Sequence, residues 1–279
     1  MIRKIKRIVN GRYQQDGAGV KLQRVIANRD IYDFDPFLML DTFDSKDSDD
    51  YIKGFPWHPH RGIETVTYLI HGKIEHSDSL GNKGEITDRY CQWMTAGSGI
   101  LHQEMPKPSP HMYGFQLWIN LPAGDKMTHP KYNDLDETKI SVFQTNDCVV
   151  RLISGNYQGN TAVMQGDYVK ADIMDVSLMP GYEWTLEVND ESTVFIYIFE
   201  GEATFFDTDT PISDHQAVLF EKGDLFKIKA GKDKLRFTLF SGMALKEPIA
   251  WGGPIVMNTK EELDQAFNEL KNNTFIKHQ

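Results

Sequence analysis

Short runs of β-branched and aromatic residues recur along this chain, and Gly, Pro, Asn or Asp lie close to their ends. Four clear runs span residues 66–70, 115–119, 194–199 and 235–240. Such side chains pack well on a pleated sheet, and several short strands at close spacing are typical of a β-sandwich or β-barrel. The pattern therefore predicts an all-β protein.

One segment near the end of the chain departs from this pattern. Thr259 is followed three positions later by Glu262, a capping box that predicts the start of a helix. Apolar residues then recur at helical spacing and mark one face, namely Leu263, Ala266, Phe267 and Leu270. We expect one C-terminal helix that packs this face on a β-barrel.

The chain also repeats part of its own pattern. A strand that runs into Gly72 resembles a strand that runs into Gly201, 129 positions later. A turn that ends at Gly97 is matched by one that ends at Gly223, 126 positions later. These offsets predict two copies of one β-module, joined within the Pro- and Asp-bearing residues 121–136.

Charge and cysteine content restrict the partners and the compartment. The chain carries 30 Lys and Arg against 40 Asp and Glu, a formal net charge of −10. This balance disfavours nucleic acid and anionic membranes, which attract basic proteins. The two cysteines exclude a disulfide scaffold and suit a reducing compartment. Because no run approaches about 18 apolar residues, we expect a cytoplasmic protein without a membrane-spanning helix.

Two polar pairs at period-two spacing carry the chemistry. His58 and His60 place two imidazoles on one side of an extended strand, and His102 and Glu104 repeat this spacing with a carboxylate. Two antiparallel strands with these pairs would bring three nitrogens and one oxygen together inside a barrel. That donor set suits a divalent first-row metal such as iron, copper, manganese, nickel or zinc. Four protein ligands would leave an octahedral metal two positions for substrate, water or dioxygen.

Longer stretches around these pairs resemble a known family. Residues 54–66 resemble the first motif of cupins in the form typical of pirins, and residues 92–106 resemble the pirin form of the second motif. Further similarity covers residues 35–37, 116–122 and 253–259, and it extends in all from about residue 10 to about residue 272. The chain therefore resembles a pirin-like bicupin.

The resemblance implies two stacked antiparallel β-barrels of the jelly-roll type, followed by the C-terminal helix. We accordingly expect an N-terminal metal-binding cupin barrel in residues 1–130 and a metal-free cupin barrel with the terminal helix in residues 131–279. One mononuclear metal is implied, and its expected ligands are His58, His60, His102 and Glu104. Iron(II) is the expected metal, with zinc, nickel, manganese, cobalt and copper as alternatives. Glu64 is expected to support the site without being a primary ligand.

The sequence itself also predicts that the second barrel lacks these ligands. A shift of 126 positions sets Ile228 opposite His102 and Ala230 opposite Glu104. No histidine occurs in residues 130–214. The second barrel is therefore expected to have a structural or regulatory role.

Several pirins are associated with quercetin 2,3-dioxygenase activity, so the resemblance implies oxidative ring opening of a flavonol-like substrate by dioxygen. Glu104 is the ligand that could also act as catalytic base and take the hydroxyl proton of the substrate. Phe55 and Trp57 are expected at the mouth of the substrate pocket, and Gln116 on a strand that faces the metal. The alternative is a metal- or redox-dependent regulatory protein that binds a transcription factor or a metabolic enzyme. In either case we expect a monomer without direct nucleic-acid contact.

Overall fold

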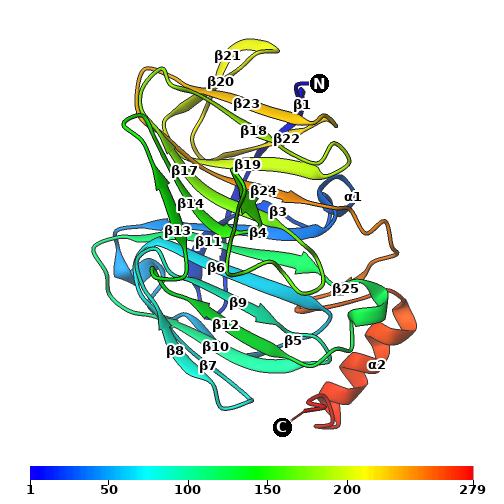
Figure 1. The fold of residues 1–279 in the computed structure, drawn as a ribbon. Helices are drawn as coiled ribbons and strands as arrows, with labels where there is room; N and C mark the ends of the chain where they lie inside the picture. Colours follow the sequence, from blue (N-terminus) through cyan, green and yellow to red (C-terminus); the bar gives the residue numbers. More distant parts are fainter. Residues whose placement is uncertain (279) are drawn as a thin grey trace. The chain divides into compact units, whose positions relative to one another are not determined.

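The regular secondary structure of the chain is mostly antiparallel β-sheet, so the all-β class is confirmed (Figure 1). The computed structural model describes residues 1–278, apart from the side chain of Asp209. The last residue of the expected 131–279 domain lies outside the described residues. The helical segments are α1 (Ile31–Phe34), the 3-10 turns η1 (Ser48–Asp50) and η2 (Ala123–Asp125), and α2 (Lys260–Lys271). Within residues 1–278, no helix is long and apolar enough to cross a membrane.

Contacts between residues divide the chain into two compact units. The histidine unit comprises Arg12–Tyr32, Phe37–Glu137 and the residues from Leu245 onward. The apolar unit comprises Met1–Gly11, Asp33–Pro36 and Thr138–Ala244. Each unit contains one seven-stranded and one four-stranded sheet.

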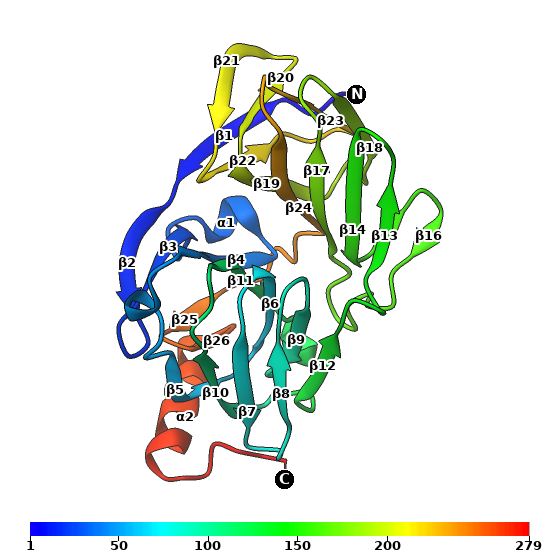
Figure 2. The ribbon, with the colours of Figure 1, turned by 90° about the vertical axis from the view of Figure 1, so that its left-hand side faces the viewer.

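The histidine unit is built on two sheets whose strands are not in sequence order. Its larger sheet consists, in spatial order, of β12 (Lys131–Leu135), β9 (Cys91–Thr95), β6 (Ile63–His71), β11 (Met112–Asn120), β4 (Phe37–Ser45), β3 (Val20–Ile26) and β2 (Arg12–Asp16). Its smaller sheet consists of β5 (Phe55–His60), β10 (Ile100–Pro106), β7 (Ile74–Asp78) and β8 (Lys83–Ile86), which lie side by side in Figure 2. The hairpin of β25 (Ala250–Gly252) and β26 (Ile255–Met257) completes this unit.

The apolar unit repeats this organisation. Its larger sheet consists, in spatial order, of β1 (Ile5–Asn10), β22 (Gln216–Phe220), β19 (Thr193–Glu200), β24 (Leu235–Gly242), β17 (Asp172–Leu178), β14 (Cys148–Ser154) and β13 (Ser141–Gln144). Its smaller sheet consists of β18 (Glu183–Glu187), β23 (Leu225–Ala230), β20 (Glu202–Phe205) and β21 (Thr208–Ser213), and a short hairpin joins β15 (Asn156–Tyr157) to β16 (Asn160–Thr161). Its interior holds one large cluster of buried apolar side chains.

The expected internal repeat extends to single residue pairs. In the histidine unit β5 pairs with β10, and His58 lies opposite His102. In the apolar unit β18 pairs with β23, and Trp184 lies opposite Ile228. Both members of the pair are shifted by 126 positions between the units. The two units are therefore two versions of one β-module.

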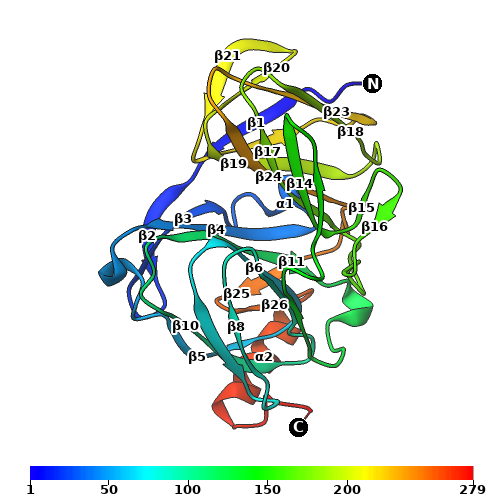
Figure 3. The same cartoon turned by 60° about the vertical axis from the view of Figure 1, so that its left-hand side comes forward.

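Each compact unit includes a segment from an end of the chain that is distant in sequence from most of the unit. Strand β1 pairs with β22 in the apolar unit, with Ile8 opposite Val218. Helix α2 belongs to the histidine unit, although we expected it with residues 131–279, because it packs on the hairpin β25–β26 (Figure 3). Each unit thus draws on several stretches of chain, and the boundary at residue 130 stays a prediction.

Helix α2 begins as its sequence indicates. The Thr259 hydroxyl accepts a hydrogen bond from the backbone N–H of Glu262 at 3.2 Å, and the Glu262 carboxylate accepts one from the N–H of Thr259 at 3.0 Å. Ala266 is fully buried against the hairpin, whereas Phe267 is 42% exposed. The capping box is confirmed, and the apolar face is narrower than the pattern indicates.

Candidate metal centre

Strands β5 and β10 bring three imidazoles together. Because alternate residues of a strand face the same side, His58 and His60 point to one side of β5. His102 lies opposite His58 on β10. The three side chains offer ligand atoms that all lie within 4.8 Å of one another. Within residues 1–278, this is the one group of three or more His, Cys, Asp or Glu side chains arranged in this way.

Hydrogen bonds at the back of two rings aim their other nitrogens at a common point. His58 Nδ1 lies 2.8 Å from the carbonyl oxygen of Pro56, and His60 Nδ1 lies 3.2 Å from that of Pro254. These carbonyls can only accept, so each Nδ1 carries the proton and each Nε2 presents a lone pair. The two Nε2 atoms are 3.1 Å apart. Two nitrogens bound at right angles to a metal at about 2.1 Å would be separated by about 3 Å.

The third imidazole is buried without a protein partner. His102 is 1% exposed, and neither of its ring nitrogens has a hydrogen-bond partner among the described residues. A buried polar group in this state is explained by a bound ion or water. Burial, and then the nearby histidines, lower the pKa of His102 well below its usual value. Burial likewise lowers the pKa of His60 to about 3, so both rings are neutral. The residues present therefore fit a metal ion.

Glu104 lies behind this cluster, where it is held by other side chains. Gln116 Nε2 donates to both of its carboxylate oxygens, at 2.9 and 2.8 Å, and the Thr67 hydroxyl donates to one of them at 3.2 Å. Trp118 Nε1 donates to Gln116 Oε1 at 3.3 Å, which turns the amide NH2 toward Glu104. Glu104 Oε2 is 4.0 Å from His102 Nε2. The role of Glu104 as fourth ligand stays a prediction.

Glu64 is completely buried on β6, and it accepts a hydrogen bond from the Thr95 hydroxyl at 2.7 Å. Thr95 belongs to the neighbouring strand β9, so this bond ties two strands of the larger sheet together. The contact gives Glu64 a structural partner. Its expected supporting role at the metal stays a prediction.

His58 and His60 line a cavity of about 560 Å³ in the histidine unit. Phe55, Trp57 and Gln116 line it too, and Trp57 is 52% exposed. The three residues expected to form a substrate pocket therefore lie around one cavity with two of the histidines. Their contact with a substrate stays a prediction.

Sequence reasoning missed a charged part of the cavity wall. Arg24 donates to both carboxylate oxygens of Asp41, at 2.8 and 2.7 Å, and to Asp16 at 2.7 Å. Burial raises the pKa of Asp41, and the bonds from Arg24 oppose this shift. Nothing in the local pattern of β2, β3 and β4 distinguishes these three residues from solvated ion pairs.

It also missed the contribution of the C-terminal hairpin. Trp251 and Pro254 line the cavity, and Pro254 is the residue whose carbonyl orients His60. The rings of Trp118 and Trp251 lie 5.8 Å apart and form a continuous aromatic wall. The similarity to pirins across residues 253–259 was the signal that could have placed this segment at the site.

Two jelly-roll units of the same strand order, one with three converging imidazoles, define a two-domain cupin. Comparison with family models identifies the particular family. Residues 19–119 match the pirin model, and residues 173–276 match the model of the pirin C-terminal cupin domain. The chain belongs to the pirin family, which confirms the expected bicupin organisation.

Relatives of known name are similar along nearly their whole length. A "Pirin-like protein" of Caulobacter vibrioides is 40% identical, with 98% of this chain and 99% of the relative covered. A protein of Pseudomonas aeruginosa named "Putative quercetin 2,3-dioxygenase PA3240" is 39% identical, with 96% of each chain covered. The crystal structure of quercetin 2,3-dioxygenase from Acinetobacter baumannii is similar with a TM-score of 0.90 at 29% identity, over 99% of each chain.

Proposed function

We propose that this chain is a metal-dependent dioxygenase that opens the ring of a flavonol-like substrate. The observation that carries the proposal is the convergence of three imidazoles, two of which line a cavity of about 560 Å³. The names of two similar proteins, one from Pseudomonas aeruginosa and one from Acinetobacter baumannii, support the quercetin 2,3-dioxygenase reaction. Dioxygen is then the second substrate.

His58, His60 and His102 would hold one divalent metal, with Glu104 as the further ligand. The bound metal supplies the Lewis acidity that lowers the pKa of a substrate hydroxyl. Iron(II) is the metal we propose, and zinc, nickel, manganese, cobalt and copper are the alternatives that this donor set accepts. The carbonyls of Pro56 and Pro254 keep the rings of His58 and His60 in the tautomer with a free Nε2.

Glu104 would take the hydroxyl proton of the substrate. Its carboxylate accepts hydrogen bonds from Gln116 and Thr67, which fix its orientation. Gln116 is itself fixed by the indole N–H of Trp118. A general base that is held in place beside the reacting group is what proton abstraction requires.

The cavity matches a planar aromatic substrate with several hydroxyl groups. Its volume lies within the range of about 300–1,000 Å³ that is usual for sites of drug-sized ligands. Phe55, Trp57, Trp118 and Trp251 provide aromatic surface. On another side, Arg24 and Asp41 provide hydrogen-bonding groups.

The test combines metal content with oxygen uptake. Protein purified without chelators is assayed for metal, and oxygen consumption with quercetin is measured after anaerobic loading with iron(II) or each alternative metal. Stoichiometric metal that is lost in His58→Ala, together with metal-dependent oxygen uptake, is the expected result. Stoichiometric metal without oxygen uptake would instead favour the regulatory alternative, a protein that binds a transcription factor or metabolic enzyme. The cytoplasmic location and the monomeric state stay predictions.

A further inference from the structure

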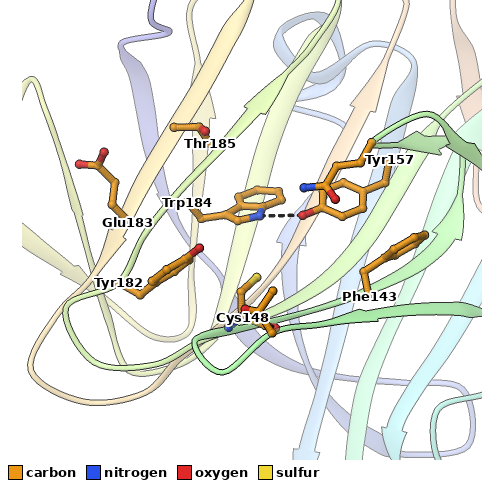
Figure 4. A pocket seen from close by; sticks show the side chains of 9 residues that line it. Phe143, Cys148, Tyr157, Tyr182, Glu183, Trp184 and Thr185 are labelled. Carbon is orange, nitrogen blue, oxygen red and sulfur yellow. Dashed lines mark hydrogen bonds between the residues drawn. The ribbon is translucent and has the colours of Figure 1, made fainter.

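The apolar unit contains a cavity of its own, of about 180 Å³. Figure 4 shows the side chains around it, with Trp184 hydrogen-bonded to Tyr157. Phe143, Cys148 and Tyr182 also line this cavity. All of these residues belong to the apolar unit, and none has a part in the proposed reaction.

This cavity shares part of its boundary with the place that corresponds to the metal cavity of the histidine unit. The metal cavity is bounded by β5 and by residues of β2, β3, β4 and β11, and the smaller cavity is bounded by β18 and by residues of β13 and β14. The order of the strands within each sheet makes β18 the counterpart of β5, and β13–β14 the counterpart of β2–β3. A pocket at this position is thus a feature of both versions of the module.

The chemistry of the pocket has changed completely. With the shift of 126 positions, Trp184 stands where the histidine unit has His58, and Leu186 where it has His60. Ile228 and Ala230 stand in the places of His102 and Glu104. None of these four side chains can bind a metal, so any occupant must be held by other forces.

Aromatic rings form one part of the wall, beside polar side chains such as Gln158 and Glu183. The rings of Phe143 and Tyr157 lie 5.1 Å apart edge to face, and those of Tyr157 and Trp184 lie 6.2 Å apart and nearly parallel. Cys148 contributes a thiol whose pKa is raised to about 11 by burial, so it is uncharged and unreactive at neutral pH. Such a wall favours contact with a further aromatic ring.

Polar groups also line the cavity, and they donate as well as accept. The Tyr157 oxygen accepts the Trp184 indole hydrogen at 3.3 Å, while its own hydroxyl hydrogen has no acceptor among the described residues. Burial raises the pKa of Tyr157, so this hydrogen is retained at neutral pH.

The edge of β18 adds backbone groups at the rim. Ala230 N–H donates to the carbonyl of Tyr182, and Val188 N–H donates to that of Asp224. In an antiparallel pair these bonds alternate along the strand, so the backbone groups of Glu183 and Thr185 point away from β23. Since β18 is an edge strand, these groups face the open side of the sheet, and both residues line the cavity.

We propose that this cavity binds an uncharged, single-ring aromatic molecule that bears a hydroxyl group, a ligand of the phenol class. The volume of about 180 Å³ sets the size, because a cavity of about 150 Å³ has room for one benzene ring. An anion is disfavoured because the lining includes the Glu183 carboxylate and neither Lys nor Arg. A cation is not required, because Lys227 already pairs with this carboxylate at 2.8 Å. The hydroxyl of the ligand would accept from Tyr157 and donate to a β18 carbonyl.

The experiment follows Trp184, which is the one tryptophan of the apolar unit among the five in the chain. The full chain is labelled with 5-fluorotryptophan, and the fluorine resonance of Trp184 is assigned from its loss in Trp184→Phe. Phenol is titrated, with cyclohexanol as the non-aromatic match of similar size and benzoate as the charged aromatic. Because the other four tryptophans lie in the histidine unit, binding at the metal cavity is detected separately and cannot be mistaken for this site.

We expect phenol to shift the Trp184 resonance saturably, and cyclohexanol and benzoate to bind at least tenfold more weakly. Tyr182→Ala should weaken phenol at least tenfold, while Phe206→Ala, which removes an exposed ring of the same unit outside the cavity, should leave it unchanged. Tyr157→Phe keeps the ring and should weaken phenol but not toluene, which provides a test if Tyr182→Ala does not fold. An unshifted Trp184 resonance, equal binding of cyclohexanol, or equal effects of Tyr182→Ala and Phe206→Ala would overturn the proposal.

Discussion

The histidine unit and the apolar unit share a strand order but differ in what fills the space between their sheets. At four corresponding positions, the histidine unit has His58, His60, His102 and Glu104, and the apolar unit has a tryptophan, a leucine, an isoleucine and an alanine. The first set leaves buried nitrogens without protein partners. The second set joins a continuous apolar core.

This difference teaches that the module does not need the polar cluster in order to fold. Apolar side chains at these positions add buried area, which stabilises the folded state by about 25 cal/mol per Å². Burial instead removes hydrogen bonds between the imidazoles and water. A ring nitrogen that has no protein partner can regain such a bond only from a ligand. The polar cluster is therefore best explained by binding, and the predictions below test that explanation from the largest expected effect to the smallest.

The largest effect should come from removing the proposed base. Glu104→Gln keeps the size and the contact with Thr67 but cannot take a proton, so we expect metal to be retained and oxygen uptake with quercetin to fall by at least about 100-fold. Glu85→Gln, which removes an exposed carboxylate from β8 of the same sheet, is the control and should leave uptake unchanged. Full activity in metal-loaded Glu104→Gln would remove the carboxylate from the mechanism.

Trp184, the counterpart of His58, should stabilise the apolar unit. Trp184 is 4% exposed and its ring lies 6.0 Å from Phe226 and 5.7 Å from Phe237. Trp184→Ala should therefore lower the free energy of unfolding of this unit by about 3–5 kcal/mol. Trp57→Ala, which removes a half-exposed ring from the histidine unit, should cost well under half as much. Urea denaturation followed by near-UV circular dichroism measures both, and equal losses would contradict the core role of Trp184.

Replacing a histidine of the metal cluster with the apolar residue found at the corresponding position of the apolar unit should stabilise the metal-free protein. His102→Ile replaces a ring with two unpaired buried nitrogens, so we expect the free energy of unfolding without metal to rise by about 1–3 kcal/mol. His60→Leu should gain less, because it also leaves the Pro254 carbonyl without its hydrogen bond. With metal added, the parent should become more stable than either variant, since binding stabilises only the chain that retains its ligands. A metal-free His102→Ile that unfolds more easily than the parent would show that the imidazole stabilises the fold by itself.

Features that depend on residues close in sequence could be predicted from the sequence alone. The period-two spacing of His58 and His60 and the capping box at Thr259 both follow from positions close in sequence. Strand type was predictable for the same reason, since β-branched and aromatic runs fit a pleated surface.

Contacts between distant segments could not be predicted in this way. Pro254 reaches His60 across 194 positions, and β1 pairs with β22 more than 200 positions later. Such pairings depend on how the sheets assemble, and a single sequence does not encode them as a periodicity. The pirin-like motif at residues 253–259 was visible, but only the fold shows that its backbone carbonyl orients a histidine.

The smallest expected effect concerns the N-cap of helix α2, and it should destabilise one unit but not the other. Thr259→Ala removes the hydroxyl that accepts from the N–H of Glu262, which should cost about 1 kcal/mol. The loss should appear in the histidine unit alone, because α2 packs on β25–β26, and because Arg61, beside His60, bonds to Glu269 and to the carbonyl of Phe275. Thr259→Ser retains the cap and should stay within a few tenths of a kcal/mol of the parent. Hydrogen exchange of backbone amides measures each unit separately. Faster exchange in β19 or β24 would mean that the stability of the apolar unit also depends on this helix. The two units would then differ in the chemistry of their interiors but would not be independently stable.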